Sequence, residues 1–198
     1  MAEQPRVASK PTLPVKVCLR TEEAQAVYGN HYAETARLLY EIEVAARIQG
    51  KEEEADKLGE QVQSYFAEAV ANLRSKQEQA KAAMRDATIE GEPTYKGALE
   101  TEVYITTPAA SQYLGVLREL DNLMVRIDAL WLNAEITTKE KLKQAREAKK
   151  IAAGPAGHVK RLKGRLNAIT RRAQETGAPG GAGESLEAEP DVAQSATA

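Results

Sequence analysis

Apolar and polar positions alternate in two short segments of the chain and recur at helical spacing in most of the rest. The alternating segments are residues 15–21 and 99–107, which are rich in β-branched side chains and contain neither Gly nor Pro. This pattern is typical of half-buried strands. A threonine, Thr21 or Thr107, ends each segment just before a helical pattern. A side-chain oxygen at that position is expected to cap the helix that follows.

Three long helices are predicted from apolar residues at steps of three and four. They cover residues 30–48, 51–87 and 109–133. A short helix over residues 22–28 should end near Gly29, so that Asn30 caps the next helix. Two basic helices between residues 138 and 174 should be separated at Gly154 and Pro155. The third long helix has the strongest apolar stripe, which comprises Tyr113, Leu117, Leu120, Met124, Ile127 and Trp131.

The two strand-to-helix passages resemble each other at an offset of 86 residues. At this offset apolar, threonine and glycine positions coincide, namely Val17 with Val103, Leu19 with Ile105, Thr21 with Thr107 and Gly29 with Gly115. An isolated strand leaves its backbone donors and acceptors unpaired, so the two strands are expected to pair antiparallel within one chain. The predicted fold is mainly α with a small antiparallel β-ribbon. It is like a ribbon-helix-helix protein with two pseudo-repeats, about 15–48 and 101–134, plus long packing helices.

Composition bounds the organisation of the chain. Residues 1–14, with three prolines, are predicted to be a flexible arm, residues 15–174 a single helical domain, and residues 175–198 a disordered acidic tail. The single cysteine, Cys18, excludes an internal disulfide and favours a reducing compartment. No apolar run suits a signal peptide or a membrane span, so we expect a cytoplasmic protein with no membrane contact.

The net charge of −2 conceals a strong segregation of charge along the chain. Residues 139–174 carry twelve basic and two acidic side chains, whereas residues 21–138 carry eleven basic and twenty-one acidic ones. Two interpretations are open at this point. The basic helices either contact nucleic acid or neutralise the acidic middle of the chain.

A two-stranded ribbon can enter the major groove of duplex DNA, with its outward side chains meeting base edges. Alternation in the two predicted strands places on the outward face Lys16, Cys18, Arg20, Glu102, Tyr104 and Thr106. Asn30, with the amides of the helix expected to start there, suits a phosphate oxygen. Phosphate contacts are also expected from Lys160, Arg161, Lys163 and Arg165. The alternative for the strand residues is an ordinary solvent-exposed sheet face.

Three segments carry a resemblance to a known family. Residues 15–32, which begin Val-Lys-Val-Cys-Leu-Arg-Thr-Glu-Glu, together with residues 99–107 and 128–133, resemble the AcaB-type regulators of conjugative plasmids and related proteins of integrating conjugative elements. The similarity covers about residues 15–172. The resemblance implies a ribbon-helix-helix protein that binds DNA and activates transcription of conjugation genes. It also implies that Lys16, Cys18 and Arg20, in the first strand, contact bases. The acidic and polar second strand departs from a plainly basic ribbon.

Chemistry-bearing motifs are absent from the sequence. It contains no nucleophile elbow, zinc-protease, phosphate-binding or dinucleotide motif, and its two histidines, His31 and His158, have no sequence context that indicates catalysis. We therefore expect no enzyme, no cofactor or metal, and no small-molecule substrate. The expected partner is double-stranded DNA, with self-association left open. The alternative function is a helical scaffold or adaptor of a conjugation apparatus that does not bind DNA.

Overall fold

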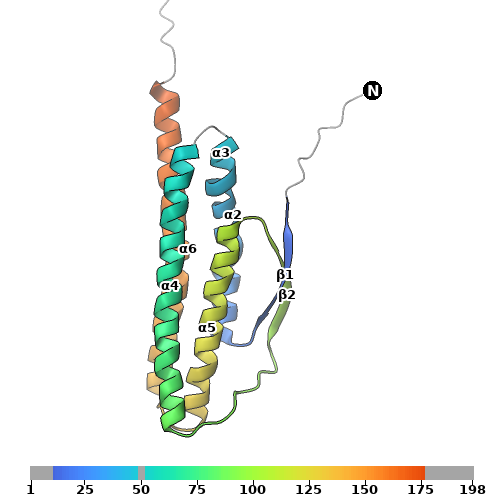
Figure 1. Ribbon diagram of the computed structural model, residues 1–198, viewed down its shortest axis with the longest axis vertical. Helices are drawn as coiled ribbons and strands as arrows, with labels where there is room; N and C mark the ends of the chain where they lie inside the picture. The colour runs from blue at the N-terminus through green and yellow to red at the C-terminus, as the bar shows by residue number, and fades with distance from the viewer. Residues whose placement is uncertain (1–10, 49–51, 177–198) are drawn as a thin grey trace, which may run out of the picture.

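A two-stranded ribbon stands beside a bundle of long helices in the computed structural model, which describes residues 11–48 and 52–176 (Figure 1). Strands β1 (Leu13–Leu19) and β2 (Leu99–Ile105) pair antiparallel, with Val15 opposite Val103 and Lys16 opposite Glu102. The two strands pair within one chain, as predicted. The predicted arm, 1–14, overlaps β1 at its end, and residues 1–10 lie outside the described residues, as does the predicted tail beyond residue 176.

Each strand leads into a helix through a threonine cap. Thr21 and Thr107 have extended backbones, and their hydroxyls accept hydrogen bonds from the amides of Ala24 and Ala110. The apolar side chains just before the caps point into the core, where they are buried: Val17, Leu19, Val103 and Ile105. The strand, the threonine cap and the first helical turn therefore recur in both predicted repeat units.

Beyond the cap the two units differ. The first continues without a break through α1 (Glu22–Val27), the π-helical turn η1 (Tyr28–Tyr32), α2 (Ala33–Tyr40), a second π-helical turn η2 (Glu41–Ala45), and α3 (Ala46–Ile48). The second is one uninterrupted helix, α5 (Pro108–Leu132), with Gly115 in its interior. The predicted pair of separate helices therefore does not form in the first unit, whereas the single helix predicted over residues 109–133 forms as α5 in the second.

The predicted helix end at Gly29 is wrong for a physical reason. Buried positions step by five residues from Val27 to Tyr32, and a π turn, in which hydrogen bonds span five residues, keeps both on the same helix face. The ring of Tyr32 stacks on Tyr28 at 5.2 Å and on Tyr113 of α5 at 6.2 Å. Core packing therefore favours the continuous helix over a break at the glycine.

Helix α5 packs against both α4 (Glu52–Asp86) and α6 (Thr138–Thr176), which also pack against each other. Its predicted apolar stripe is buried except at its last member, Trp131, which is 37% exposed at the end of the bundle. There the ammonium of Lys141 lies 4.0 Å from the centre of the Trp131 ring. The prediction of Trp131 as a core residue is therefore wrong, because its ring is only partly covered, by Lys141 and Thr138 at the start of α6.

Helix α6 runs through the predicted break at Gly154 and Pro155. An interior proline removes one backbone hydrogen bond, but Ala152, Ala156 and Val159 on either side of it are buried against the bundle. This packing holds the two halves in one rod. The expectation of two basic helices is corrected to one long basic helix, whose end lies beyond the other helices of the bundle in Figure 1.

Candidate nucleic-acid interface

The outer face of the ribbon presents polar side chains to solvent. Exposed residues on this face are Lys16 and Cys18 from β1 and Glu100, Glu102 and Tyr104 from β2. Lys16 lies directly opposite Glu102, and the hydroxyl of Tyr104 donates to a Glu102 carboxylate oxygen at 3.2 Å. This hydrogen bond raises the pKa of Tyr104. The face is open for contact because these side chains are exposed. It is slightly acidic because it carries one cation and two carboxylates.

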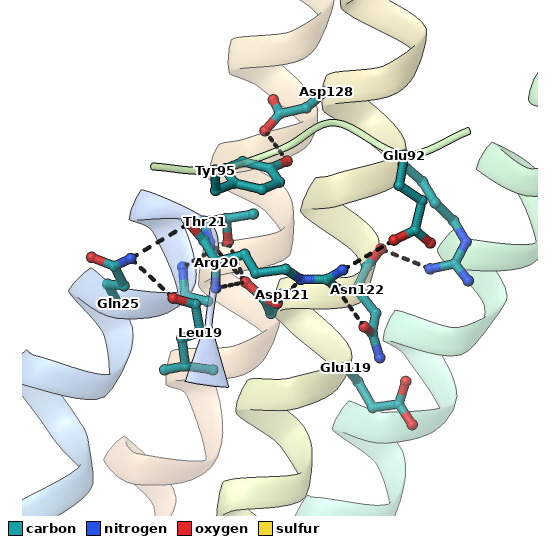
Figure 2. Close-up of polar contacts among 12 residues, drawn as sticks. Leu19, Arg20, Thr21, Gln25, Glu92, Tyr95, Glu119, Asp121, Asn122 and Asp128 are labelled. Atoms are coloured by element: carbon teal, nitrogen blue, oxygen red, sulfur yellow. Dashed lines mark hydrogen bonds and ion pairs between the residues drawn. The ribbon is translucent and has the colours of Figure 1, made fainter. Parts of the chain in front are cut away.

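Arg20 does not join this outer face, which corrects its predicted role as a base contact. It lies one residue beyond the end of β1, and its side chain runs along α5 (Figure 2). Its guanidinium donates to the carboxylate of Asp121 at 3.0 Å, to the side-chain oxygen of Asn122 at 2.9 Å and to Glu92 at 3.0 Å. With all three acceptors taken from the protein itself, Arg20 is a structural anchor.

Asp121 is the centre of that anchor. The residue is buried at 3% exposure, and one of its carboxylate oxygens accepts hydrogen bonds from the backbone amides of Arg20 and Thr21, both at 2.8 Å, and from the Thr21 hydroxyl at 3.0 Å. Gln25 adds a second tie, because its amide donates to the carbonyls of Leu19 and Gly97 at 3.0 and 2.8 Å. These bonds fix the base of the ribbon to α1 and α5.

Two other predicted contact residues also lie away from the ribbon face. Asn30 is exposed inside the π turn η1, so it caps no helix, and no free helix amides adjoin it. The helix N-terminus on which the phosphate site was predicted is therefore not present at Asn30. Thr106 follows the end of β2 and is half-buried. It lines a hollow of about 410 Å³ with Glu43 and Arg47 at the start of α5, so it does not share the outward face of Tyr104.

The basic residues of α6 divide into two sets. Several pair with acidic side chains of the bundle: Lys160 with Glu34 at 3.2 Å, Lys163 with Glu41 at 3.1 Å and Lys141 with Asp128 at 2.7 Å. For Lys160 and Lys163, predicted to bind phosphate, the structure favours the alternative that they neutralise the acidic middle. Arg161 donates to Nδ1 of His158 at 2.8 Å, and Arg165 is exposed.

The second set of cations contains two predicted residues, Arg161 and Arg165, and four that were missed in the sequence analysis. We call it the cationic face of α6; its members are Lys139, Lys143, Arg146, Lys150, Arg161 and Arg165. All are exposed, and among the described residues none of them makes an ion pair within 4.0 Å. The first four are separated by four, three and four residues, a spacing that places them on one side of a helix. That spacing is visible in the sequence and could have identified them.

The cationic face is long enough to follow a nucleic-acid backbone. At 1.5 Å per residue, Lys139 and Arg165 lie about 39 Å apart along the axis of α6, which is close to the roughly 34 Å length of one turn of duplex DNA. In Figure 1 the ribbon lies on the side of α5 away from α4 and α6. The ribbon and α6 are therefore separate elements, which single-site variants can address independently.

Other kinds of site find little support in the described part of the chain. No group of three or more His, Cys, Asp or Glu side chains there could hold a metal ion. His158 stacks on Tyr65 at 3.8 Å, and burial together with Arg161 lowers the pKa of His158. Among the helices of residues 11–48 and 52–176, none combines the length and apolar character needed to cross a bilayer.

Comparison with known proteins identifies the fold. No protein-family model matches the chain, and no curated protein matches it. Among solved structures, the chain is similar to selenomethionine-containing AcaB from uropathogenic E. coli, with a TM-score of 0.78 and 24% sequence identity over 85% of this chain and 88% of that chain. The chain therefore has an AcaB-like fold, which is mainly helical with a two-stranded antiparallel sheet, in agreement with the sequence resemblance.

Proposed function

We propose that this chain is a DNA-binding regulatory protein that uses the cationic face of α6 for phosphate contacts and the outer face of the ribbon for base contacts. The observation that carries the proposal is the cationic face itself. The chain has a net charge of −2, yet six exposed cations on one helix make no ion pair within 4.0 Å among the described residues. Clustered, unpaired cations of this kind are the electrostatic footprint of nucleic-acid binding.

The ribbon supplies the second part of the proposal. Proteins that insert a two-stranded ribbon into the major groove need an exposed ribbon face with polar side chains. That requirement is met here by Lys16, Cys18, Glu102 and Tyr104. Lys16 suits guanine and Glu102 suits the amino group of cytosine. Because the face carries more acid than base, its affinity for phosphate is low, and we assign it to sequence preference while α6 supplies most of the affinity.

A regulatory role in conjugation or on a mobile element is the most specific part of the proposal. It is supported by the resemblance of residues 15–32, 99–107 and 128–133 to AcaB-type regulators and by the likeness of the fold to AcaB. We further propose a cytoplasmic location and binding as a single chain, since β1 and β2 already complete the ribbon.

The test is the salt dependence of binding to a labelled duplex of random sequence, measured by fluorescence anisotropy. Each lost phosphate contact lowers the slope of log affinity against log salt concentration by about 0.9. The variant K143Q/R146Q/K150Q should therefore bind every duplex more weakly and lose up to about 2.7 units of slope. All three side chains are exposed, so folding should be retained.

A matched control removes the same charge from elsewhere on the surface. K57Q/K81Q/K96Q replaces three exposed lysines on α4 and in the segment before β2, and it should leave the slope unchanged. Equal effects of the two variants would show that only net charge matters and would overturn the assignment to α6. If the unaltered protein binds no duplex, the proposal fails and the adaptor function replaces it.

A further inference from the structure

The side chains of the cationic face make no ion pair within 4.0 Å among the described residues, and the chain beyond α6 contains acidic residues. Residues 177–198 include Glu184, Glu187, Glu189 and Asp191 and no lysine or arginine. This stretch begins where the helix that carries the cationic face ends, at Thr176. An exposed set of cations is therefore followed in the chain by a segment whose charged residues are all acidic.

We propose that residues 184–191 dock on the C-terminal half of the cationic face, against Arg161 and Arg165, and compete there with nucleic acid. Carboxylates form strong, charge-assisted hydrogen bonds with guanidinium groups, and neither arginine contacts a carboxylate among the described residues. The exposed positions Gly157 and Gly164 lie on the same side of α6 and leave both guanidinium groups accessible.

The length of chain fits this contact. Arg165 and Arg161 lie about 17 and 23 Å back along α6 from Thr176, at 1.5 Å per residue. Glu184 and Asp191 follow Thr176 by 8 and 15 residues, which span at most about 26 and 50 Å when fully extended. An unstructured chain of these lengths has a typical end-to-end distance of about 16 to 21 Å. The carboxylates therefore reach Arg161 and Arg165 without extension, at an effective concentration near the millimolar range.

The consequence for DNA rests on the proposed function, but the contact itself does not. DNA binds only to molecules in which the face is free. The apparent affinity for DNA is therefore the intrinsic affinity multiplied by the fraction of such molecules. Neutralising the segment should therefore tighten duplex binding at low salt. We expect a change of about tenfold, which corresponds to a face that is free in roughly one molecule in ten.

The contact is tested first without DNA, on the full chain. Cys18 is exposed and is replaced by serine, and a spin label is attached at A188C, between Glu187 and Glu189. Paramagnetic broadening of backbone amide signals around Arg161 and Arg165 is then measured at low and high salt. The matched control carries the same label together with E184Q/E187Q/E189Q/D191N, which keeps the length of the segment and removes its charge.

Broadening at Arg161 and Arg165 that disappears in high salt and in the neutral control is the expected result. Broadening confined to the end of α6, or equal in the control, would overturn the contact. Broadening that grows with protein concentration would assign the contact to a second copy and overturn docking within one chain.

The competition is tested next, by comparing the duplex affinity of two unlabelled proteins, one with the natural segment and one with E184Q/E187Q/E189Q/D191N. If the contact is present and neither protein binds DNA, the proposed function fails and the competition with it. If DNA binds equally to both, the competition alone is overturned.

Discussion

Replacing Asp121 with alanine tests the anchor that joins the ribbon to α5. The buried carboxylate accepts hydrogen bonds from two backbone amides and one hydroxyl, and it pairs with the Arg20 guanidinium at 3.0 Å. Each buried donor left without an acceptor costs about 1–3 kcal/mol, and removal of one partner of a buried ion pair typically costs about 3–5 kcal/mol. We therefore expect D121A to lower the free energy of unfolding by about 3–5 kcal/mol.

Urea unfolding followed by circular dichroism measures this effect, and R20A completes a double-mutant cycle. The Arg20 side chain is 31% exposed, and its removal leaves Asp121 with donors from Thr21 and from the backbone. R20A should therefore cost less, about 1–2 kcal/mol. The combined variant should cost less than the sum of the two. A loss below about 1 kcal/mol for D121A would refute the anchor. An R20A protein of unchanged stability but altered DNA preference would restore Arg20 as a base contact.

Three further predictions concern the helices. T107A removes the hydroxyl that accepts from the Ala110 amide and caps α5, so it should lower stability in urea by about 1 kcal/mol; an unchanged midpoint would show that the cap contributes nothing. Burial raises the pKa of Tyr32 to about 12. The folded protein therefore keeps a proton that the unfolded chain loses, and stability should fall as pH rises from 10 towards 12. Y32F should make this fall shallower in urea titrations at several pH values, and an identical pH profile would contradict the burial argument. P155A restores an amide donor inside α6 and should raise the thermal midpoint, since an interior proline costs about 3 kcal/mol; a lowered midpoint would show that packing of the buried ring contributes more than the proline costs.

Local patterns were sufficient for most of the elements. Alternation over residues 15–21 and 99–107 predicted both strands, and the threonine caps and the apolar stripe of α5 followed from residue type and spacing. These features depend on neighbours within one or two turns, and the sequence displays them directly.

Features that depend on distant packing were not predictable. Gly29 and Pro155 are helix-ending residues by local preference, yet core contacts carry the helix through both. Arg20 continues the alternation of β1 by one residue, and nothing in the sequence links it to Asp121, which follows 101 residues later. On α6 the spacing of Lys139, Lys143, Arg146 and Lys150 was available, but which cations stay unpaired depends on acidic residues from other helices.

Selection from a pool of randomised duplexes, using the full chain, tests the proposed function most directly. The ribbon is formed by two strands of one chain with different outer residues, so it cannot read two equivalent half-sites. We predict enrichment of one sequence without a dyad, with K16A relaxing the preference at one side of the site. Enrichment of a palindrome would contradict binding as a single chain, and failure to enrich any duplex would contradict the DNA-binding function itself.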